Sequence, residues 1–310
     1  MVGTLRVGAA NQAIGLAMGK MSNDEMDNVM ATRTKAFPAA TKGRGGALLA
    51  PTLETDGTKR FDLIASEFDW EVEPGRVVKA MGYNGVVPGP TIKAQPGDKV
   101  RVVVKNELPE STAVHFHGLV VPNNMDGVPD ITQPPIKPGS TFTYEFVAQG
   151  PAVGMYHSHH HAEVQVPAGL AGAFIIGDIP LPGGVKPTME YPMMLNDSGE
   201  IGLSLNAKSF PATEPIVVKL GDTVLIHYLN EGALMHPMHL HGMPQLVVAK
   251  DGNPLAQPYY ADTVNVAPGE RFTVLVKADQ PGVWAYHCHI LNHAERSDGM
   301  FGMVTAMVVS

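Results

Sequence analysis

The stretch GDKVRVVVKNELPESTAVHFHG, residues 97–118, recurs in this chain as GDTVLIHYLNEGALMHPMHLHG, residues 221–242, and the two align without a gap. A second stretch repeats in the same way: PGSTFTYEFVAQGPAVGMYHSH at 138–159 aligns with PGERFTVLVKADQPGVWAYHCH at 268–289. The offset is 124 residues for the first pair (221 minus 97) and 130 for the second (268 minus 138). The second copy therefore carries six additional residues between 242 and 268. Two ungapped matches in the same order indicate an internal duplication.

Each copy has the pattern of a set of short β-strands. The segments VRVVV, FTYEF, VLIHY and FTVLV are rich in β-branched and aromatic residues, and the chain's 33 glycines and 26 prolines supply turn residues. We therefore predict an all-β fold of two sandwich domains, at 59–180 and 190–310. A Pro/Gly-containing linker at 181–189 joins them. Residues 1–58 show no motif, and we predict an N-terminal arm there with a short amphipathic helix around 19–33.

The overall composition argues against several classes of protein. The formal net charge is −8, from 22 basic and 30 acidic residues, which argues against a nucleic-acid-binding role. No run of about 18 apolar residues occurs, so we expect no transmembrane helix. The single cysteine permits no intramolecular disulfide, and the N-terminus lacks a clear signal-peptide layout.

Eight of the thirteen histidines form four His-x-His pairs at equivalent positions of the two copies. The pairs are His115 and His117, His157 and His159, His239 and His241, and His287 and His289. On a strand, residues two apart point to the same face, so each pair presents two imidazoles together. Imidazole suits copper, zinc, iron and nickel. One such pair is equally compatible with core or surface histidines, but four pairs in register across a duplication indicate metal ligands.

The lone cysteine, Cys288, lies between the two histidines of the last pair, so on a strand it faces away from both. His236 precedes His239 by three residues, and the same parity places it on the face opposite the second-copy pair. His293 and Met300 follow Cys288 by five and twelve residues. Two histidines, one cysteine and a distant methionine are the ligands of a blue-copper electron-transfer site. One strand is thus predicted to contact two different metal centres.

The first copy lacks this second ligand set. Ungapped alignment places Thr112 opposite His236, Ser158 opposite Cys288, Glu163 opposite His293 and Leu170 opposite Met300. The His-x-His pairs persist in both copies while all four of these ligands are absent from the first. This pattern predicts two separable kinds of metal site, with the sulfur-containing one only in the second domain.

These residues resemble the multicopper oxidases, and in particular their two-domain, laccase-like branch. The matching stretches are YNGVVPGPTI (83–92), HFHG (115–118), MDGVPDITQPPIKPG (125–139), MYHSH (155–159), HPMHLHG (236–242) and WAYHCHILNH (284–293), so the resemblance covers about residues 80–310. It implies two cupredoxin-like Greek-key domains and four coppers per functional unit: one type 1, one type 2 and two type 3.

The resemblance also implies the role of individual residues. His236, Cys288, His293 and Met300 would hold type 1 copper, with Met303 as the competitor for the axial position. A trinuclear cluster would take His115, His117, His157, His159, His239, His241, His287 and His289. Asp126 would be an acid that helps deliver protons to the cluster, although an ordinary turn aspartate is the alternative. Glu295 would substitute for a second family acid, because the family position holds Leu291 here; an exposed loop acid is its alternative.

The implied activity is one-electron oxidation of phenols or aromatic amines at type 1 copper, coupled to four-electron reduction of O2 to water. Oxidation of a metal ion such as cuprous copper is the alternative, and a copper nitrite reductase or an electron-transfer module fits the eight histidines less well. The two-domain relatives build the cluster between chains, so the expected assembly is a homotrimer. The expected partners are O2 and a small donor, with no nucleic acid and no membrane, and the resemblance implies a periplasmic or secreted location.

Overall fold

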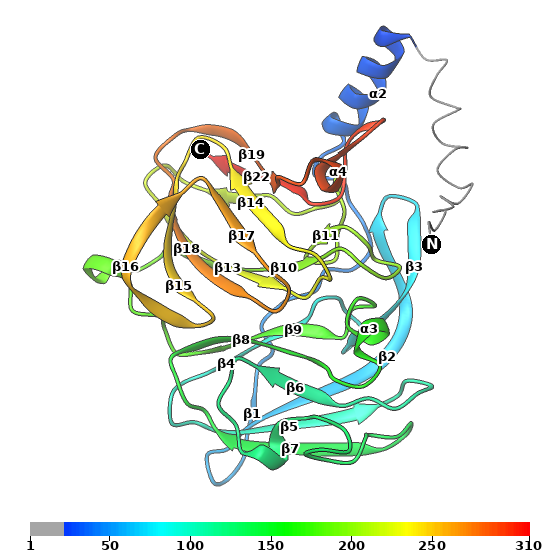
Figure 1. Cartoon of the computed structure of the whole chain (residues 1–310), viewed down its shortest axis with the longest axis vertical. Helices are drawn as coiled ribbons and strands as arrows, with labels where there is room; N and C mark the ends of the chain where they lie inside the picture. Colours follow the sequence, from blue (N-terminus) through cyan, green and yellow to red (C-terminus); the bar gives the residue numbers. More distant parts are fainter. Residues whose placement is uncertain (1–21) are drawn as a thin grey trace, which may run out of the picture.

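The computed structural model describes residues 22–310 and shows two β-sandwich domains, one above the other in Figure 1. An N-terminal arm runs along them and carries the helix α2 (Asn23–Lys35). The predicted helix at 19–33 is confirmed within the described residues, while 19–21 lie outside them. None of its residues is fully buried, but Met30 packs against the backbone of Gly299. A capping box between Ser22 and Glu25 begins the helix. No helix among residues 22–310 has the length and apolarity that a membrane span requires.

The first domain consists of two sheets. Its elements are β1 (Thr52–Leu53), β2 (Lys59–Glu73), β3 (Arg76–Tyr83), β4 (Gly89–Ala94), β5 (Lys99–Asn106), β6 (Val114–His117), η1 (Asn123–Met125), β7 (Thr141–Val147), β8 (Ala152–Ser158), α3 (Ala162–Gln165) and β9 (Ala171–Ile176). One sheet has the order β1-β2-β5-β7, with β3 also paired to β2, and the other has the order β4-β9-β8-β6. A buried apolar core that includes Phe61, Phe116 and Phe174 fills this domain.

The second domain repeats this plan. Its elements, after the turn η2 (Pro182–Gly184), are β10 (Met189–Asn196), β11 (Ser204–Leu205), β12 (Ile216–Val218), β13 (Thr223–Asn230), β14 (His236–Leu240), β15 (Gln245–Lys250), β16 (Asn253–Ala261), β17 (Thr263–Val266), β18 (Arg271–Lys277), β19 (Gly282–Cys288), α4 (Leu291–Ala294), β20 (Glu295–Arg296), β21 (Gly299–Met300) and β22 (Val304–Val309). The main sheets have the orders β11-β10-β13-β18-β15-β16 and β12-β22-β19-β14-β17.

The strand pairings confirm the duplication. In each domain a parallel pair, β2 with β5 or β10 with β13, continues into an antiparallel strand, β7 or β18. The other sheet repeats as β4-β9-β8-β6 and β12-β22-β19-β14. The region of the six-residue insertion holds the strands β15, β16 and β17, whereas the corresponding part of the first domain contains only η1 and loops.

The strand register corrects one detail of the ungapped alignment. His157 pairs with Ala171 in the first domain, and His287 pairs with Val304 in the second. The residue before each partner is Leu170 or Met303, so Leu170 is the counterpart of Met303 and not of Met300. The connection after the second-domain histidines is three residues longer (303 minus 288 against 170 minus 158), and a gapless comparison cannot register that difference.

A buried lysine joins the arm to both domains. Lys208 of the second domain is only 1% exposed, and its Nζ donates to the carbonyls of Lys42 in the arm and Glu71 in β2. The same ammonium lies 3.9 Å from the ring centroid of Trp70. Burial lowers the pKa of Lys208 to about 8. The two carbonyls and the ring offset part of the cost of burying its charge.

Candidate metal centres

Cys288 lies at the centre of a buried sulfur site. Its Sγ is 3.7 Å from Nδ1 of His236 and 3.7 Å from Nδ1 of His293. All three residues are buried, and their ligand atoms lie within 4.8 Å of one another. The strand pattern explains the arrangement, because Cys288 of β19 is opposite Met238 of β14, two residues after His236. The short helix α4 then turns the chain back and brings His293 to the sulfur.

This donor set fits copper. Burial raises the pKa of the Cys288 thiol to about 11 and lowers the pKa of His293, so both groups are held neutral in the metal-free protein. A bound cation reverses this preference for the thiol, because the thiolate is the form that binds metal. A thiolate with two imidazoles in an apolar surrounding is a set that copper takes in electron-transfer sites.

Asp197 was missed in the sequence analysis. Its side chain is 1% exposed, and its Oδ2 lies 3.0 Å from Nε2 of His236, although the imidazole is not aligned for a regular hydrogen bond. Burial alone would raise the carboxyl pKa, but His236, Ser198 and the amides of Ala233 and Leu234 hold it well below its usual range. Asp197 follows β10, about 40 residues before the ligand, and no motif surrounds it.

The two candidate axial methionines occupy different surroundings. Met303 is fully buried in the same apolar cluster as Cys288. Met300 lies on β21, is partly exposed, and packs with Ala294, Phe210 and Phe37. Since the register makes Met303 the counterpart of Leu170, the sequence alignment no longer favours Met300 over Met303.

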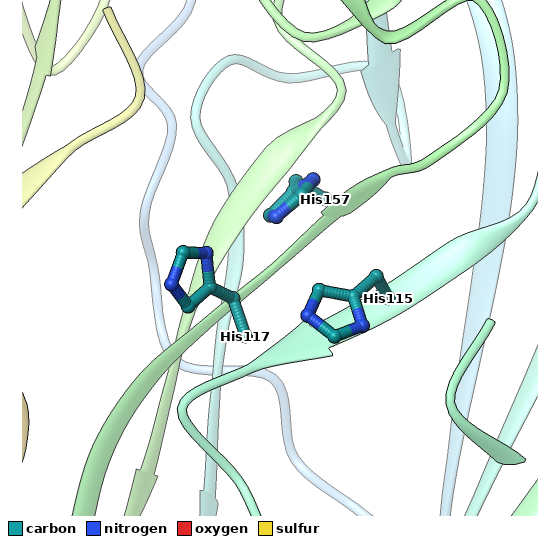
Figure 2. Close-up of side chains that lie close together, drawn as sticks. All are labelled: His115, His117 and His157. Carbon is teal, nitrogen blue, oxygen red and sulfur yellow. The ribbon is translucent and has the colours of Figure 1, made fainter. Parts of the chain in front are cut away.

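The first-domain histidines converge on one face of the sheet. Figure 2 shows His115 and His117 on one strand, β6, with His157 from the neighbouring β8. Ligand atoms of these three lie within 4.8 Å of one another. The ring of His159 is 5.5 Å from that of His115. The predicted pairs of the first domain therefore form one group.

The second-domain histidines form a matching group on β14 and β19. The ring centroid of His239 lies 4.8 Å from that of His241, 5.7 Å from that of His287 and 5.5 Å from that of His289. The Nε2 atoms of His241 and His287 are 3.1 Å apart. One of these two nitrogens can donate to the other in the metal-free protein, and their proximity would also allow both to bind one metal ion.

Backbone carbonyls orient one histidine of each pair. Nδ1 of His115 donates to Asp126 (2.7 Å), His157 to Ser158 (2.8 Å), His239 to Asp262 (2.9 Å) and His287 to Cys288 (3.0 Å). These bonds place the ring proton on Nδ1, so Nε2 is the nitrogen of each ring that would bind a metal. His236 and His293 instead present Nδ1 to the sulfur. The two kinds of site therefore differ in which ring nitrogen faces the metal position. The carbonyl of Asp262 is a hydrogen-bond partner that the sequence analysis did not identify.

Electrostatics keep several of the cluster histidines neutral. Burial lowers the pKa of His115, His157, His241 and His287. The pKa of His117 falls to about 3, through burial first and then through the positive charge of Arg271. Neutral imidazole is the form that binds a metal, so the protein favours the ligand state before any metal arrives.

The two groups of four do not meet within one chain. Among residues 22–310, no hydrogen bond or ring contact joins a first-domain cluster histidine to a second-domain one, and no group of potential metal ligands includes both. His159, His241 and His289 are exposed. The chain therefore presents two separate groups of four imidazoles.

The two predicted acids differ in their surroundings. Oδ1 of Asp126 lies 3.4 Å from Nδ1 of His115, and its side chain is 36% exposed, so it lies between solvent and a cluster histidine. Glu295 is exposed on β20, where its backbone pairs with Met300. No hydrogen bond among the described residues joins the Glu295 carboxylate to a cluster imidazole, so its role rests on sequence position alone.

A buried polar network fills the first-domain counterpart of the sulfur site. Thr112, Ser158 and Gln165 are all fully buried. The hydroxyls of Thr112 and Ser158 lie 2.9 and 2.6 Å from Oε1 of Gln165, and 3.2 Å from each other. Gln165 thus takes the place that the alignment assigned to Glu163, which is exposed. This domain has replaced the sulfur-site ligands with hydrogen-bonded side chains.

Known proteins share both domains. Family models described as multicopper oxidase match residues 65–180 and 184–309. The blue copper oxidase from Nitrosomonas europaea is 34% identical with a TM-score of 0.76, over 81% of this chain and 85% of that one. The multicopper oxidase mgLAC is 38% identical with a TM-score of 0.76, over 81% and 86%.

Copper resistance protein A of Pseudomonas syringae pv. tomato is 36% identical over 148 residues, which are 48% of this chain and 24% of that protein. The chain spans about half, or less, of the length of the curated relatives it matches. Two matched domains, the solved structures above and a donor set suited to copper lead to one conclusion: the chain belongs to the multicopper oxidase family.

Proposed function

We propose that this protein is a laccase-like oxidase, which removes single electrons from phenolic or aromatic amine donors and reduces O2 to water. One observation carries the proposal. Cys288 turns its sulfur toward His236 and His293, while its chain neighbours His287 and His289 belong to the second-domain imidazole group. A single strand therefore gives a short covalent route between a donor-side site and an oxygen-side site.

The residues divide into two ligand sets. Copper supplies one-electron redox chemistry at both. His236, Cys288 and His293, with Met300 as the axial thioether, would hold the type 1 ion. His115, His117, His157, His159, His239, His241, His287 and His289 would hold one type 2 and two type 3 ions. Asp126 would pass protons from solvent toward the cluster, because its carboxylate stands beside His115. Glu295 would be a second proton donor.

The complete cluster would form between chains. Each imidazole group includes exposed rings and lies apart from the other group of the same chain. Contact between the first domain of one copy and the second domain of the next is heterologous, and such contacts must close into a ring to avoid an open filament. A ring of three copies is the assembly that we propose.

Complementation tests this arrangement. His157→Ala damages only the first-domain group, and His287→Ala damages only the second-domain group. Each variant alone should be inactive. Co-expressed, they should regain activity, because an intact first domain from one variant meets an intact second domain from the other. Light scattering should give three times the chain mass. A fully inactive mixture, or a monomer with four coppers, would rule out clusters between chains.

The surroundings of the type 1 site favour organic donors over cuprous ions. Of the methionines that flank His236, Met238 and Met243 are fully buried in the domain core. Met235 is 53% exposed, and it is the only one of these three with a thioether at the surface. Cuprous ion prefers soft thioether ligands, so a cuprous oxidase is expected to expose several of them near the donor site. Periplasmic or secreted location is also proposed, and cell fractionation tests it.

Copper content and oxygen uptake test the activity. The parent should bind four coppers per chain and consume O2 with a phenol faster than with cuprous ion. Cys288→Ser should lose the blue colour, bind about three coppers, and lose nearly all turnover while retaining a folded circular dichroism spectrum. Equal turnover by Cys288→Ser and the parent would refute the route. Two coppers with nitrite reduction would indicate a nitrite reductase, and one copper without turnover an electron carrier.

A further inference from the structure

The hairpin that carries Met300 has little structure of its own. It consists of β20 and β21, two residues each, directly after His293. The only strand pairs are Glu295 with Met300 and Arg296 with Gly299. Its first three residues, 295–297, are exposed, whereas Gly299 is buried. An isolated hairpin of this size is not stable in water, so its position depends on what packs against it.

Arg33 of the arm helix binds this hairpin from outside the domain. Its Nε donates to the carbonyl of Met300 at 2.6 Å, and its Nη2 donates to the carbonyl of Phe210 at 2.7 Å. The same Nη2 lies 2.6 Å from Oε2 of Glu73 in the first domain. Nη1 lies 3.8 Å from Asp298, in the turn of the hairpin. The Arg33 side chain is 15% exposed, so water screens these contacts only in part.

Two apolar contacts hold the arm against the second domain, one of them at the hairpin. Gly299 has a φ of +102°, and a Cβ built there would come within 3.1 Å of the Met30 side chain, so the helix lies close against the hairpin backbone. The ring of Phe37, just after the helix, stacks on Phe210 at 5.1 Å. The arm, the first domain and the type 1 loop therefore meet at Arg33.

We propose that Arg33 is a positioning residue for the type 1 site: through the carbonyl of Met300 it fixes the hairpin that carries the axial thioether. The proposal rests on the proposed function for the role of Met300. The planar guanidinium contacts three parts of the protein at once: the hairpin, the Phe210 carbonyl and Glu73. A lysine ammonium lacks this fixed geometry and could not make the same set of contacts. Without the guanidinium, the hairpin keeps its two backbone pairs and the apolar packing of Met300 and Met30, but it loses its charge-assisted contact and samples other positions.

Hydrogen exchange on the copper-free full-length protein tests the clamp itself. In Arg33→Ala, amides of residues 295–301 should exchange about tenfold faster or more, because a charge-assisted contact is lost. Arg33→Lys should give an intermediate rate. Arg44→Ala is the matched control, since Arg44 is also an arm arginine that donates to a second-domain carbonyl, that of Ala212, but it makes no contact with the hairpin. Its exchange over 295–301 should equal that of the parent.

Copper-loaded samples test the link to the metal. Arg33→Ala should alter the type 1 absorption band and the copper hyperfine splitting, while Arg44→Ala should not. Unchanged exchange in Arg33→Ala would overturn the clamp, and faster exchange with an unaltered type 1 spectrum would overturn its role at the site. If the parent lacked a type 1 signal, the proposed function would fail, whereas the exchange comparison would still decide the clamp. Should Arg33→Ala not fold, Glu73→Gln must show the same changes at smaller size.

Discussion

The backbone amide of Cys288 donates to the carbonyl of Met303 at 3.0 Å. The two residues face each other across β19 and the start of β22, so the Met303 side chain points into the core on the same side as the sulfur. The amide of Met303 in turn donates to the carbonyl of His293. Met303 thus borders the sulfur site, while Met300 lies on the hairpin and packs with Phe210 and Ala294.

Leucine substitutions distinguish the two methionines. Met300→Leu should raise the type 1 reduction potential, because the lost thioether stabilises the oxidised ion more than the reduced one. Met303→Leu conserves volume and should cost less than about 1.5 kcal/mol of stability with an unaltered type 1 spectrum. Redox titration and visible spectra check both. The reverse pattern would make Met303 the axial ligand.

Removal of the charge on Asp197 should also raise the potential. Its carboxylate lies 3.0 Å from the His236 imidazole and stabilises the more positive, oxidised site. In Asp197→Asn we expect an increase on the order of 50–100 mV. Asp222→Asn is the control, because it removes a charge at the far end of β13, where Asp222 accepts from the Lys219 amide. Equal shifts in both variants would point to a general charge effect.

The polar network of the first domain makes a prediction about stability. Gln165→Leu leaves the buried hydroxyls of Thr112 and Ser158 short of a partner, which should cost about 1–3 kcal/mol. The triple variant Thr112→Val, Ser158→Ala, Gln165→Leu removes both sides of the bonds among these three side chains and should recover part of the loss. Urea unfolding of copper-free protein measures both. A triple variant less stable than Gln165→Leu would contradict this account.

Acid should weaken the contact between the domains at Glu190. This carboxylate accepts from Nε2 of buried His227 at 2.8 Å and pairs with Lys93 of the first domain. Burial opposes ionisation, but these partners outweigh it and lower the pKa from 4.5 to about 2. A lowered carboxyl pKa stabilises the fold above about pH 4.5, and that contribution is lost as pH falls toward 2.

The expected contribution of Glu190 is on the order of 2–3 kcal/mol at neutral pH. Urea unfolding of the copper-free protein at about pH 6 and pH 3 measures it. Glu190→Gln should show a smaller loss on acidification than the parent. Glu145→Gln, which removes an exposed partner of Arg101, should behave like the parent. A Glu190→Gln variant with the parental acid sensitivity would assign the effect to other groups.

The internal duplication and the two-residue alternation of side chains along strands were sufficient to predict most of the fold and of the ligand geometry. Alternation alone placed His236 and Cys288 on the buried face and His239 and His241 on the other, as the structure shows. Local patterns encode such features, because strand residues two apart share a face. The division of the ligands into two sets followed from comparing the copies.

Features set by loops and by distant packing could not be predicted. Leu170 corresponds to Met303 because the connection that follows the last histidine pair is three residues longer in the second domain. That connection is irregular, so strand periodicity does not predict its length. Asp197 and Arg33 reach their partners from 39 and 267 residues away in sequence, through contacts that no local pattern encodes. The Asp262 carbonyl is a backbone group, so its residue type carries no signal.

The buried Lys208 has a consequence for how the molecule comes apart. Its ammonium donates to a carbonyl of the arm and to a carbonyl of the first domain. Unfolding of the second domain would leave both carbonyls without this donor. Unfolding of the first domain would leave the Lys208 charge without these acceptors, which is unfavourable in an apolar environment. The two sandwich domains should therefore unfold as one cooperative unit. Calorimetry of the copper-free chain is expected to show a single endotherm, which Lys208→Met would split into two.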